Sequence, residues 1–261
     1  MSLRFLFGPA GSGKSTKVQK ELIEMAAANP DKNFLLIVPD QFTMQTQMDI
    51  VKLSPNKGIL NIDVLSFGRL SYRVFSETGM PDYPILDDTG KSLVLRRVAS
   101  KVADSMPYIG RNLGKIGYIH EIKSSISEFM QYGLSPMDVT KLSESLDIGV
   151  LKNKLSDLAV IYNAFCDYNR EKFVTSEETL DILCKKLPEA DFIRDSYVVF
   201  DGFTGFTPIQ ERVILSVLKL AKKVTFTFTL STPEKPSDLG GEEKLFHLSR
   251  RSANRLRTLA K

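Results

Sequence analysis

The sequence has few of the residues that build disulfide frameworks or metal clusters, and it has no long apolar run. Its two cysteines, Cys166 and Cys184, are isolated in a chain of 261 residues. They therefore suggest neither a disulfide network nor a cysteine metal site. No apolar stretch approaches the length of a membrane span, and no secretory signal is visible. These absences favour a cytoplasmic protein with no membrane partner.

The remaining composition is that of an ordinary globular protein. Hydrophobic residues make up 43% of the chain and charged residues 25%, and the length suits one large or two modest domains. The formal net charge of +4 leans mildly toward a nucleic-acid partner. Charge of this size is common in proteins that bind no nucleic acid, so the motifs have to decide the function.

The most informative segment is a glycine-rich octapeptide near the N-terminus, residues 8–15, which fits the phosphate-binding pattern G-x-x-x-x-G-K-[ST] at every position. A short apolar strand over residues 3–7 precedes it, and a helix over residues 16–28 follows. Backbone N–H groups and the positive end of the helix dipole then surround a phosphate. Lys14 would reach the β- and γ-phosphates, and Ser15 would hold Mg²⁺. The nucleotide-binding residues we expect are Gly8, Pro9, Ala10, Gly11, Ser12, Gly13, Lys14, Ser15 and Thr16. A glycine-rich turn without a ligand is the alternative.

Apolar patterning divides the chain into three parts. Strand and helix signals alternate over residues 1–86, with strands expected at 33–38 and 59–65 and helices at 41–53 and from 66. Only helical periodicity is visible from residue 87 to about 187, including a capping box formed by Thr175 and Glu178. Strands return at residues 197–200 and 224–230, with a helix from residue 207 between them. A polar tail with a basic helix candidate follows.

This order predicts an α/β fold with a parallel sheet, interrupted by a helical insertion. We expect residues 1–86 and 191–261 to form a P-loop core and residues 87–190 to form the insertion.

A second nucleotide signal follows the strand at residues 197–200. P-loop enzymes place an acid at the end of a buried strand to orient Mg²⁺, often followed by a glutamate that activates water. Asp201 supplies the first acid, but Gly202 stands where the glutamate is expected. General-base assistance contributes roughly 10²–10⁴-fold. We therefore expect ATP binding with slow or no hydrolysis. The alternative for Asp201 is a plain turn residue.

Five segments, in their order and spacing, resemble the N-terminal region of the AddB family, the B subunits of bacterial ATP-dependent helicase–deoxyribonucleases. They are the P-loop and residues 36–41, 64–70, 176–180 and 197–203. The resemblance covers nearly the whole chain. It implies a RecA-like P-loop NTPase core of the superfamily 1 helicase type, called domain 1A, with the helical insertion corresponding to domain 1B.

The resemblance also implies a track for single-stranded DNA. Superfamily 1 helicases contact the strand through the segments that correspond here to residues 39–44 and 66–67. Four polar side chains would contact DNA by this analogy, namely Gln41, Thr43, Ser66 and Arg69. Phe42 and Phe67 either stack on bases or belong to the core.

The cofactors and partners implied by the family are ATP, Mg²⁺, single-stranded DNA at a duplex end, and the helicase–nuclease A subunit in a heterodimer. An iron–sulphur cluster would belong only to a C-terminal region outside this sequence. The implied activity of the whole protein is the unwinding and resection of double-strand ends for recombinational repair. Two alternatives remain open: a stand-alone P-loop kinase or phosphotransferase, and a non-catalytic nucleotide-binding module.

Overall fold

The computed structural model describes residues 2–55, 57–58, 61–113, 115–230, 241 and 243–259. The chain forms two compact units. We call Met1–Met80 together with Leu183–Lys261 the core unit, and Pro81–Ile182 the helical unit. The sequence predicted domain boundaries after residues 86 and 190, and the compact units divide a little earlier, after Met80 and Ile182.

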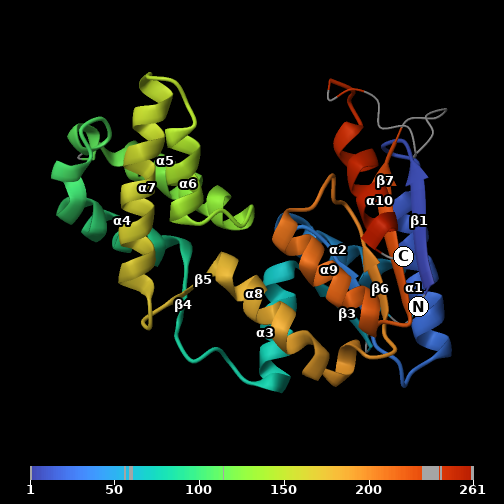
Figure 1. Ribbon diagram of the computed structural model, residues 1–261. Coiled ribbons are helices and arrows are strands. Elements are labelled where there is room, and N and C mark those ends of the chain that lie inside the picture. Colours follow the sequence, from blue (N-terminus) through green and yellow to red (C-terminus); the bar gives the residue numbers. More distant parts are fainter. Residues whose placement is uncertain are drawn as a thin grey trace. The chain divides into compact units, whose positions relative to one another are not determined.

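The core unit is built on a parallel sheet (Figure 1). In spatial order its strands are β1 (Ser2–Gly8), β7 (Lys223–Thr229), β6 (Tyr197–Phe200), β2 (Phe34–Ile37) and β3 (Ile62–Leu65). Every neighbouring pair runs parallel. The inner strands are short and buried on both faces, as parallel sheets between helices require. The α/β prediction is confirmed, and residues 59 and 60 of the predicted third strand lie outside the described residues.

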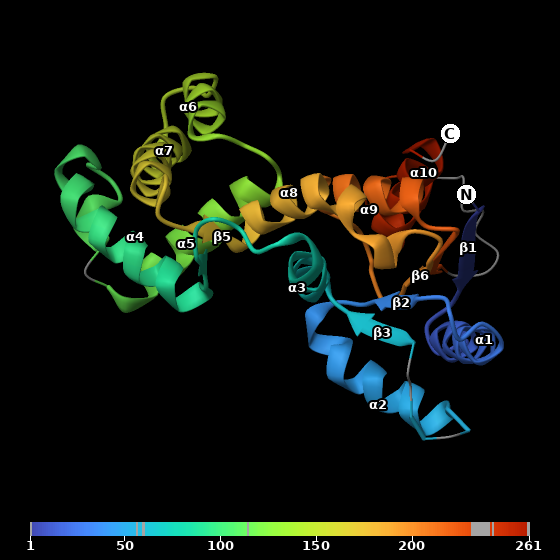
Figure 2. The same cartoon turned by 90° about the horizontal axis from the view of Figure 1, so that it is seen from below.

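Helices cover both faces of this sheet (Figure 2). One face carries α1 (Lys14–Ala28) and α2 (Thr43–Leu53); the other carries α3 (Phe67–Thr78), α9 (Pro208–Leu220) and α10 (His247–Leu259). On the first face, Val18 and Leu22 of α1 pack with Phe34 and Leu36 of β2 and with Ile50 of α2. Strand side chains alternate between faces, so the remaining β2 residues supply the core under the second helical layer.

The second face carries a layer of phenylalanines. Phe200 stacks on Phe226 with ring centroids 4.7 Å apart, and Phe67 lies 6.0 Å from Phe200 and 5.6 Å from Phe203. Phe67 is only 6% exposed, whereas Phe42 is 48% exposed. Phe67 is therefore a core residue, and Phe42 alone of the two presents its ring to solvent.

The helical unit has its own apolar core. Its helices are α4 (Asp88–Val102), α5 (Ile116–Gln131), α6 (Pro136–Glu144) and α7 (Val150–Asn169). Leu95, Ile126 and Phe165 are fully buried where α4, α5 and α7 meet. The short strands β4 (Ile85–Leu86) and β5 (Val174–Thr175) pair in parallel at the base of the unit. The sequence predicted only helices between residues 87 and 187 and so missed β5, because two residues are too short to show strand periodicity.

Helix α8 (Ser176–Lys186) begins in the helical unit and ends in the core unit. Its first turn has the predicted capping box: Glu178 Oε2 accepts from the Thr175 N–H at 2.7 Å, and the Glu178 N–H donates to Thr175 Oγ1 at 3.2 Å.

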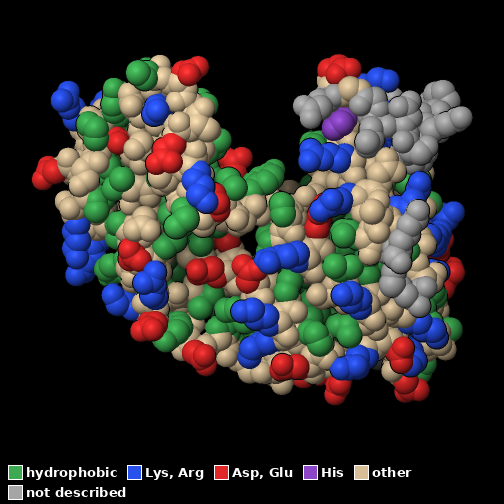
Figure 3. Space-filling view, in the orientation of Figure 1, with side chains coloured by type: hydrophobic (Ala, Val, Ile, Leu, Met, Phe, Trp, Pro, Cys, Tyr) green, Lys and Arg blue, Asp and Glu red, His purple; other side chains and the backbone are tan. Residues whose placement is uncertain are grey.

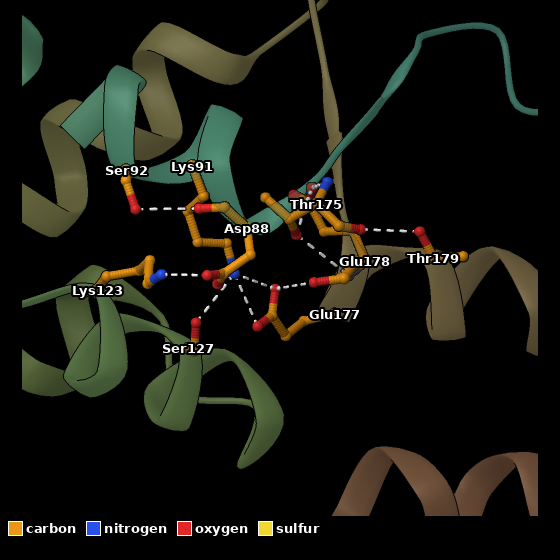
Figure 4. Close-up of polar contacts among 10 residues, drawn as sticks. Asp88, Lys91, Ser92, Lys123, Ser127, Thr175, Glu177, Glu178 and Thr179 are labelled. Carbon is orange, nitrogen blue, oxygen red and sulfur yellow. Dashed lines mark hydrogen bonds and ion pairs between the residues drawn. The ribbon is translucent and has the colours of Figure 1, made fainter. Parts of the chain in front are cut away.

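Beside this turn lies a buried polar cluster (Figure 4). Lys91 Nζ donates to the two carboxylate oxygens of Glu177, at 2.8 and 2.7 Å, and to Ser127 Oγ at 2.9 Å. Lys123 Nζ forms a short ion pair with the exposed carboxylate of Asp88. These contacts tie α4, α5 and α8 together. We call these five residues the Lys91 cluster.

Candidate nucleotide-binding site

The predicted phosphate loop connects β1 to α1, at the carboxyl-end edge of the sheet. Gly11 and Gly13 have φ angles of +75° and +79°, in the left-handed region that only glycine adopts without strain. This conformation turns successive N–H groups toward one side of the chain and forms a concave site for an anion. The glycines at these two positions therefore allow the left-handed backbone of the loop, and their contact with phosphate stays a prediction.

Gly8 packs closely against the loop, so a side chain there would require the exposed Ser12 hydroxyl to move. A Cβ atom on Gly8 would lie 2.7 Å from Ser12 Oγ, closer than a non-bonded carbon and oxygen can approach. The Gly8 carbonyl also accepts from the Leu230 N–H at 3.0 Å, which fixes the start of the loop to the end of β7. The loop is therefore anchored at its first residue and exposed from Pro9 to Gly13.

The first turn of α1 has unused hydrogen-bond donors. Its N-cap residue Gly13 provides no side-chain cap, and the first turn contains no acidic residue. The first intrahelical bond after the cap runs from the Lys17 N–H to the Gly13 carbonyl at 2.8 Å. Since the initial N–H groups of a helix have no intrahelical acceptor, those of Lys14, Ser15 and Thr16 are free to donate to an anion.

Lys14 lies in this loop with a single intramolecular contact among the described residues. Its Nζ donates to the Pro9 carbonyl at 2.7 Å. Partial burial lowers the pKa of Lys14, and attraction to the Asp201 carboxylate opposes that shift. The Asp201 carboxylate is thus close enough to Lys14 to attract its ammonium group.

Asp201 follows β6 and is only 6% exposed. Its N–H donates to the Ile37 carbonyl at 2.9 Å, and its Oδ1 accepts a short hydrogen bond from Thr227 Oγ1. Thr227 belongs to β7, which lies between β1 and β6. The sequence did not single out Thr227, although the alternation of Thr and Phe over residues 225–229 places the threonines on one side of the sheet and the phenylalanines on the other.

Gly202 adopts a φ angle of +81°, so a non-glycine residue would be strained there. A Cβ atom would lie 3.5 Å from Pro39 Cδ and 3.9 Å from a ring carbon of Phe42. Replacing Gly202 by glutamate would therefore place a residue in a strained backbone conformation, in addition to adding the carboxylate. The positive φ after Asp201 disfavours a side chain there, and a Cβ atom would make ordinary van der Waals contact with Pro39 and Phe42.

A shallow concave surface of about 490 Å³ borders the loop and runs along α1. It is lined by Gly13, Thr16, Lys17, Lys20, Glu21 and Glu24. Arg4 of β1 forms a bidentate ion pair with Glu21 beside it. The lining contains two lysines and two glutamates but no aromatic side chain to stack on a base, so it offers little to select adenine over other bases.

The donor set fits a nucleotide phosphate and its Mg²⁺. The free N–H groups, the Lys14 ammonium and the positive-φ glycines suit a phosphate, and exposed Ser15 with buried Asp201 supplies two oxygen ligands of the kind Mg²⁺ takes. Among the described residues, no three His, Cys, Asp or Glu side chains group to hold a metal ion. Mg²⁺ at this loop would therefore depend on phosphate oxygens for other ligands.

The four predicted DNA-contact residues fall into two pairs. Gln41 and Arg69 are exposed after the ends of the neighbouring strands β2 and β3. Thr43 is 4% exposed and its Oγ1 donates to the Asp40 carbonyl at 2.9 Å. Ser66 is 1% exposed and its Oγ caps α3 by accepting from the Arg69 N–H at 3.3 Å. The hydroxyl groups of Thr43 and Ser66 therefore form hydrogen bonds within their own segments. Of the four residues, only Gln41 and Arg69 are exposed to solvent.

A profile of the family described as ADDB, N-terminal, matches residues 5–261. The chain belongs to the AddB N-terminal family. Curated relatives of this AddB domain include proteins of Lachnoclostridium phytofermentans, 41% identical over 261 residues, and of Moorella thermoacetica, 35% identical over 266 residues. A third, from Alkaliphilus oremlandii, is 31% identical over 261 residues. All three are named as the B subunit of an ATP-dependent helicase/deoxyribonuclease.

These alignments cover 100% of this AddB domain but only 22% to 23% of each relative. The domain thus spans less than a quarter of the proteins it matches. None of the helices in the described part of the chain is both long and apolar enough to cross a membrane.

Proposed function

We propose that this AddB N-terminal domain is a RecA-like P-loop domain that binds ATP with Mg²⁺ and hydrolyses it slowly or not at all. The observation that carries the proposal is the phosphate loop itself. Glycines with left-handed φ angles, a helix start without a side-chain cap and Lys14 belong to one loop, and Lys14 is attracted to the Asp201 carboxylate. A bound phosphate satisfies donors that otherwise have only water.

Each residue has a role that follows from its chemistry. The N–H groups from Gly11 to Thr16 and the helix dipole orient the phosphates. The Lys14 ammonium turns from the Pro9 carbonyl to phosphate oxygens and holds their charge, while Ser15 and Asp201 hold Mg²⁺. The metal ion, when bound, neutralises phosphate charge. Thr227 keeps the Asp201 carboxylate in place through its hydroxyl hydrogen bond.

Slow hydrolysis follows from the backbone at Gly202. No carboxylate follows Asp201 to accept a proton from an attacking water, and the positive φ of Gly202 disfavours one. The bound nucleotide then sets a conformation of the domain.

Single-stranded DNA is the second ligand that we propose. Gln41, Phe42 and Arg69 are exposed where β2 and β3 end, and they combine an amide, an aromatic ring and a guanidinium, the groups that bind single strands by hydrogen bonding, stacking and charge. Thr43 and Ser66 hold the backbone of the same segments.

For the longer protein, the relatives' names support a role as the B subunit of an ATP-dependent helicase–deoxyribonuclease. We propose that the whole protein works with an A subunit in the cytoplasm, on single-stranded DNA at duplex ends, in double-strand-break repair. Any iron–sulphur cluster belongs to its C-terminal region. Membership of the AddB family favours this function over a stand-alone kinase.

Titration of a fluorescent ATP analogue into the 261-residue chain, with Mg²⁺ present, tests the nucleotide site. Lys14→Ala should weaken binding by roughly 10- to 100-fold, the usual cost of a lost charged contact. The matched control Lys52→Ala, at an exposed lysine of α2, should leave the affinity unchanged. Equal affinity in Lys14→Ala and the native chain would sink the proposal.

Steady-state ATP turnover, with and without single-stranded DNA, tests slow hydrolysis. We expect no turnover above background in either condition. A rate of many per second that Lys14→Ala abolishes would show that another residue acts as the general base.

The DNA track is tested with a labelled single strand at low salt. Arg69→Ala should weaken binding, whereas Arg170→Ala, an exposed arginine of the helical unit, should not. Ser66→Ala should lower stability through the lost helix cap, by about 1 kcal/mol, with little effect on DNA affinity beyond that.

A further inference from the structure

The turn between α6 and α7 exposes large aliphatic side chains to solvent. Ile148, in the turn itself, is 96% exposed. Val150 and Leu151 at the start of α7, and Leu142 near the end of α6, are also exposed. We call these four residues the hairpin tip. Hydrophobic side chains are visible at the upper end of α7 in the space-filling view (Figure 3).

Hydrogen bonds hold the backbone on both sides of the hairpin tip. The Ser145 N–H donates to the Lys141 carbonyl at 3.0 Å, which closes the last turn of α6. Lys152 Nζ donates to the Leu146 carbonyl at 3.2 Å, which ties the turn to the beginning of α7. Side chains on a backbone held in this way lose less conformational entropy when they bind a partner than side chains on a free loop do.

The hairpin tip takes no part in the core of the helical unit. In α6 and α7 that core is formed by residues such as Val139, Ile161 and Phe165, which are fully buried. The four tip residues are not among the described residues that form this core or pack against it. Single exposed hydrophobic residues are common on protein surfaces, whereas a cluster such as this one, within residues 142–151, is typical of a surface that another protein surface covers.

The charged residues beside the hairpin tip indicate what kind of surface fits it. Lys141, Glu144, Asp147 and Lys154 are exposed there, two of each sign. Charges of mixed sign create no strong positive field, so they do not favour a polyanion such as a nucleic acid. An apolar centre with a polar rim is instead the usual composition of a protein interface. The occupant is therefore a protein surface with an apolar patch of its own.

The hairpin tip lies at the end of α7 that is remote from β4 and β5. The twenty residues of α7 span about 30 Å. At the other end of the helix, the Asn169 carbonyl accepts from the Phe173 N–H at 3.0 Å, directly before β5, and β5 pairs with β4. The residues through which the chain enters and leaves these helices therefore cannot cover the tip.

The length of the relatives indicates where a covering surface comes from. This AddB domain makes up only 22% to 23% of each of the three relatives, so most of such a polypeptide lies outside the domain and is joined to it covalently. Linkage through one chain can raise the effective concentration of a binding surface to the order of millimolar. A separate subunit lacks this advantage, which favours the same polypeptide as the occupant.

We propose that the hairpin tip docks onto the part of the longer AddB polypeptide that lies outside this domain, through an apolar patch on that part. An apolar contact of this kind holds the helical unit in place, whereas the more polar contacts usual between domains permit relative motion. The proposal rests on the length of the family's proteins and on the helical unit. It does not depend on the proposed nucleotide site or on the proposed DNA track.

Hydrogen exchange followed by mass spectrometry tests whether the hairpin tip is covered. The comparison is between the amides of residues 145–153 in the 261-residue chain and the same amides in the full-length B subunit without an A subunit. We expect exchange to be at least about tenfold slower in the full-length protein, because docking holds the turn closed and excludes water from it. Circular dichroism checks that both proteins are folded.

Substitution of Ile148 in the full-length protein tests the contact itself. Ile148→Asp should return the exchange of residues 145–153 to the rates of the 261-residue chain, because a buried unpaired charge opposes docking. Ile148→Ser repeats the test without a charge. The matched control Leu93→Asp, at an exposed leucine of α4, should keep the slow exchange. Neither change at Ile148 should alter the urea unfolding of the 261-residue chain, since that side chain is already exposed there.

Four results would overturn the proposal. Equal exchange in the two proteins would show that the tip stays uncovered. Protection that appears only when an A subunit is added would make that subunit the occupant. Self-association of the 261-residue chain that Ile148→Asp abolishes would make a second copy the occupant. Slow exchange that survives both changes at Ile148 would place the contact elsewhere. Nucleotide binding is the same in every case, so failure here is distinguishable from failure of the proposed function.

Discussion

Two lysines of this AddB domain, Lys14 in the phosphate loop and Lys91 in the helical unit, show how differently one side chain is used. Lys91 is 3% exposed and donates to three oxygens, two of Glu177 and one of Ser127. An ammonium has three N–H donors, so Lys91 is saturated. Lys14 makes one such contact among the described residues, to a backbone carbonyl. We propose that the lysine that binds phosphate is Lys14, which makes fewer hydrogen bonds within the described structure than Lys91 does.

The groups around Lys91 and those around Lys14 differ in the same way as the two lysines do. The Lys91 cluster supplies a carboxylate and a hydroxyl at short distance, so the charge is neutralised inside the protein. The phosphate loop has N–H donors in the first turn of α1, its Pro9 carbonyl accepts from Lys14, and the Asp201 carboxylate attracts Lys14. The charge of Lys91 is matched within the protein, and we propose that a bound anion matches the charge of Lys14.

The largest effect on stability is expected when the buried ion pair between Lys91 and Glu177 is broken. Lys91→Met leaves the Glu177 carboxylate buried without its partner, which typically costs about 3–5 kcal/mol of unfolding free energy. Lys14→Met should change the free energy of unfolding by less than about 0.5 kcal/mol, because it removes one contact at the surface. Urea unfolding of the two variants measures the difference. The double variant Lys91→Met/Glu177→Leu should recover much of the loss, and equal stability of both single variants would refute the comparison.

The next effect concerns pH and the unsaturated lysine. Burial lowers the pKa of Lys14 from 10.5, and phosphates bind its protonated form. Nucleotide affinity should therefore be full at neutral pH and fall as the pH rises through the lowered pKa, which is reached before 10.5. The fall should approach the loss caused by Lys14→Ala.

Lys14→Arg is the matched control for this titration, since arginine stays protonated throughout the range. Its nucleotide affinity, measured by the same fluorescence titration, should be flat over these pH values. An identical decline in Lys14→Arg would assign the titration to another group.

A smaller effect is expected from Gly202→Glu, which inserts the missing carboxylate. The residue must adopt a φ of +81°, so we expect a loss of about 1–2 kcal/mol in stability. We also expect no gain in ATP turnover, since the Pro39–Phe42 turn occupies the adjacent space. Gly202→Ala separates the strain from the carboxylate. Turnover that appears only with glutamate would show that the backbone can rearrange.

The smallest effect concerns the exposed partner of the Lys91 cluster. The pKa of Asp88 is lowered, chiefly by its hydrogen bond to Lys123. A lowered folded-state pKa means that this ion pair stabilises above the ordinary value of 3.8 and that the contribution is lost as the pH falls through the folded value. Because Asp88 is 84% exposed, solvent screening limits its contribution to under about 1 kcal/mol. Asp88→Asn should lower the urea midpoint slightly at neutral pH and leave it unchanged in acid.

The residues of the proposed phosphate site were chosen from local sequence alone, and their role in binding stays a prediction. Gly8, Gly11 and Gly13 are recognisable because a tight phosphate loop needs glycine at fixed spacing, and Asp201 because it directly follows a short apolar strand. Thr227 was not predicted as its partner, since strand order depends on pairing between distant segments. The insertion of β7 between β1 and β6 brings that hydroxyl to the acid.

The local sequence pattern also did not predict which polar side chains are buried. Ser66 and Thr43 are polar and follow strand ends, which is typical of ligand contacts, yet both serve to fix local backbone. Lys91 and Glu177 are 86 positions apart, so nothing in the neighbourhood of either residue predicts a buried pair. Helical periodicity predicted the helices that pack together, but it did not predict the ion pair between Lys91 and Glu177.

The pairing of β4 with β5 has a consequence for how the helical unit could have been acquired. Ile85 lies opposite Val174, and Leu86 lies opposite Thr175, and neighbouring strands are only about 4.8 Å apart. Within the helical unit, the chain therefore enters and leaves the segment that carries helices α4–α7 at neighbouring positions. The helices between β4 and β5 can therefore be lengthened, exchanged or deleted while the ends of this segment stay adjacent and the parallel sheet of the core unit keeps its strand order.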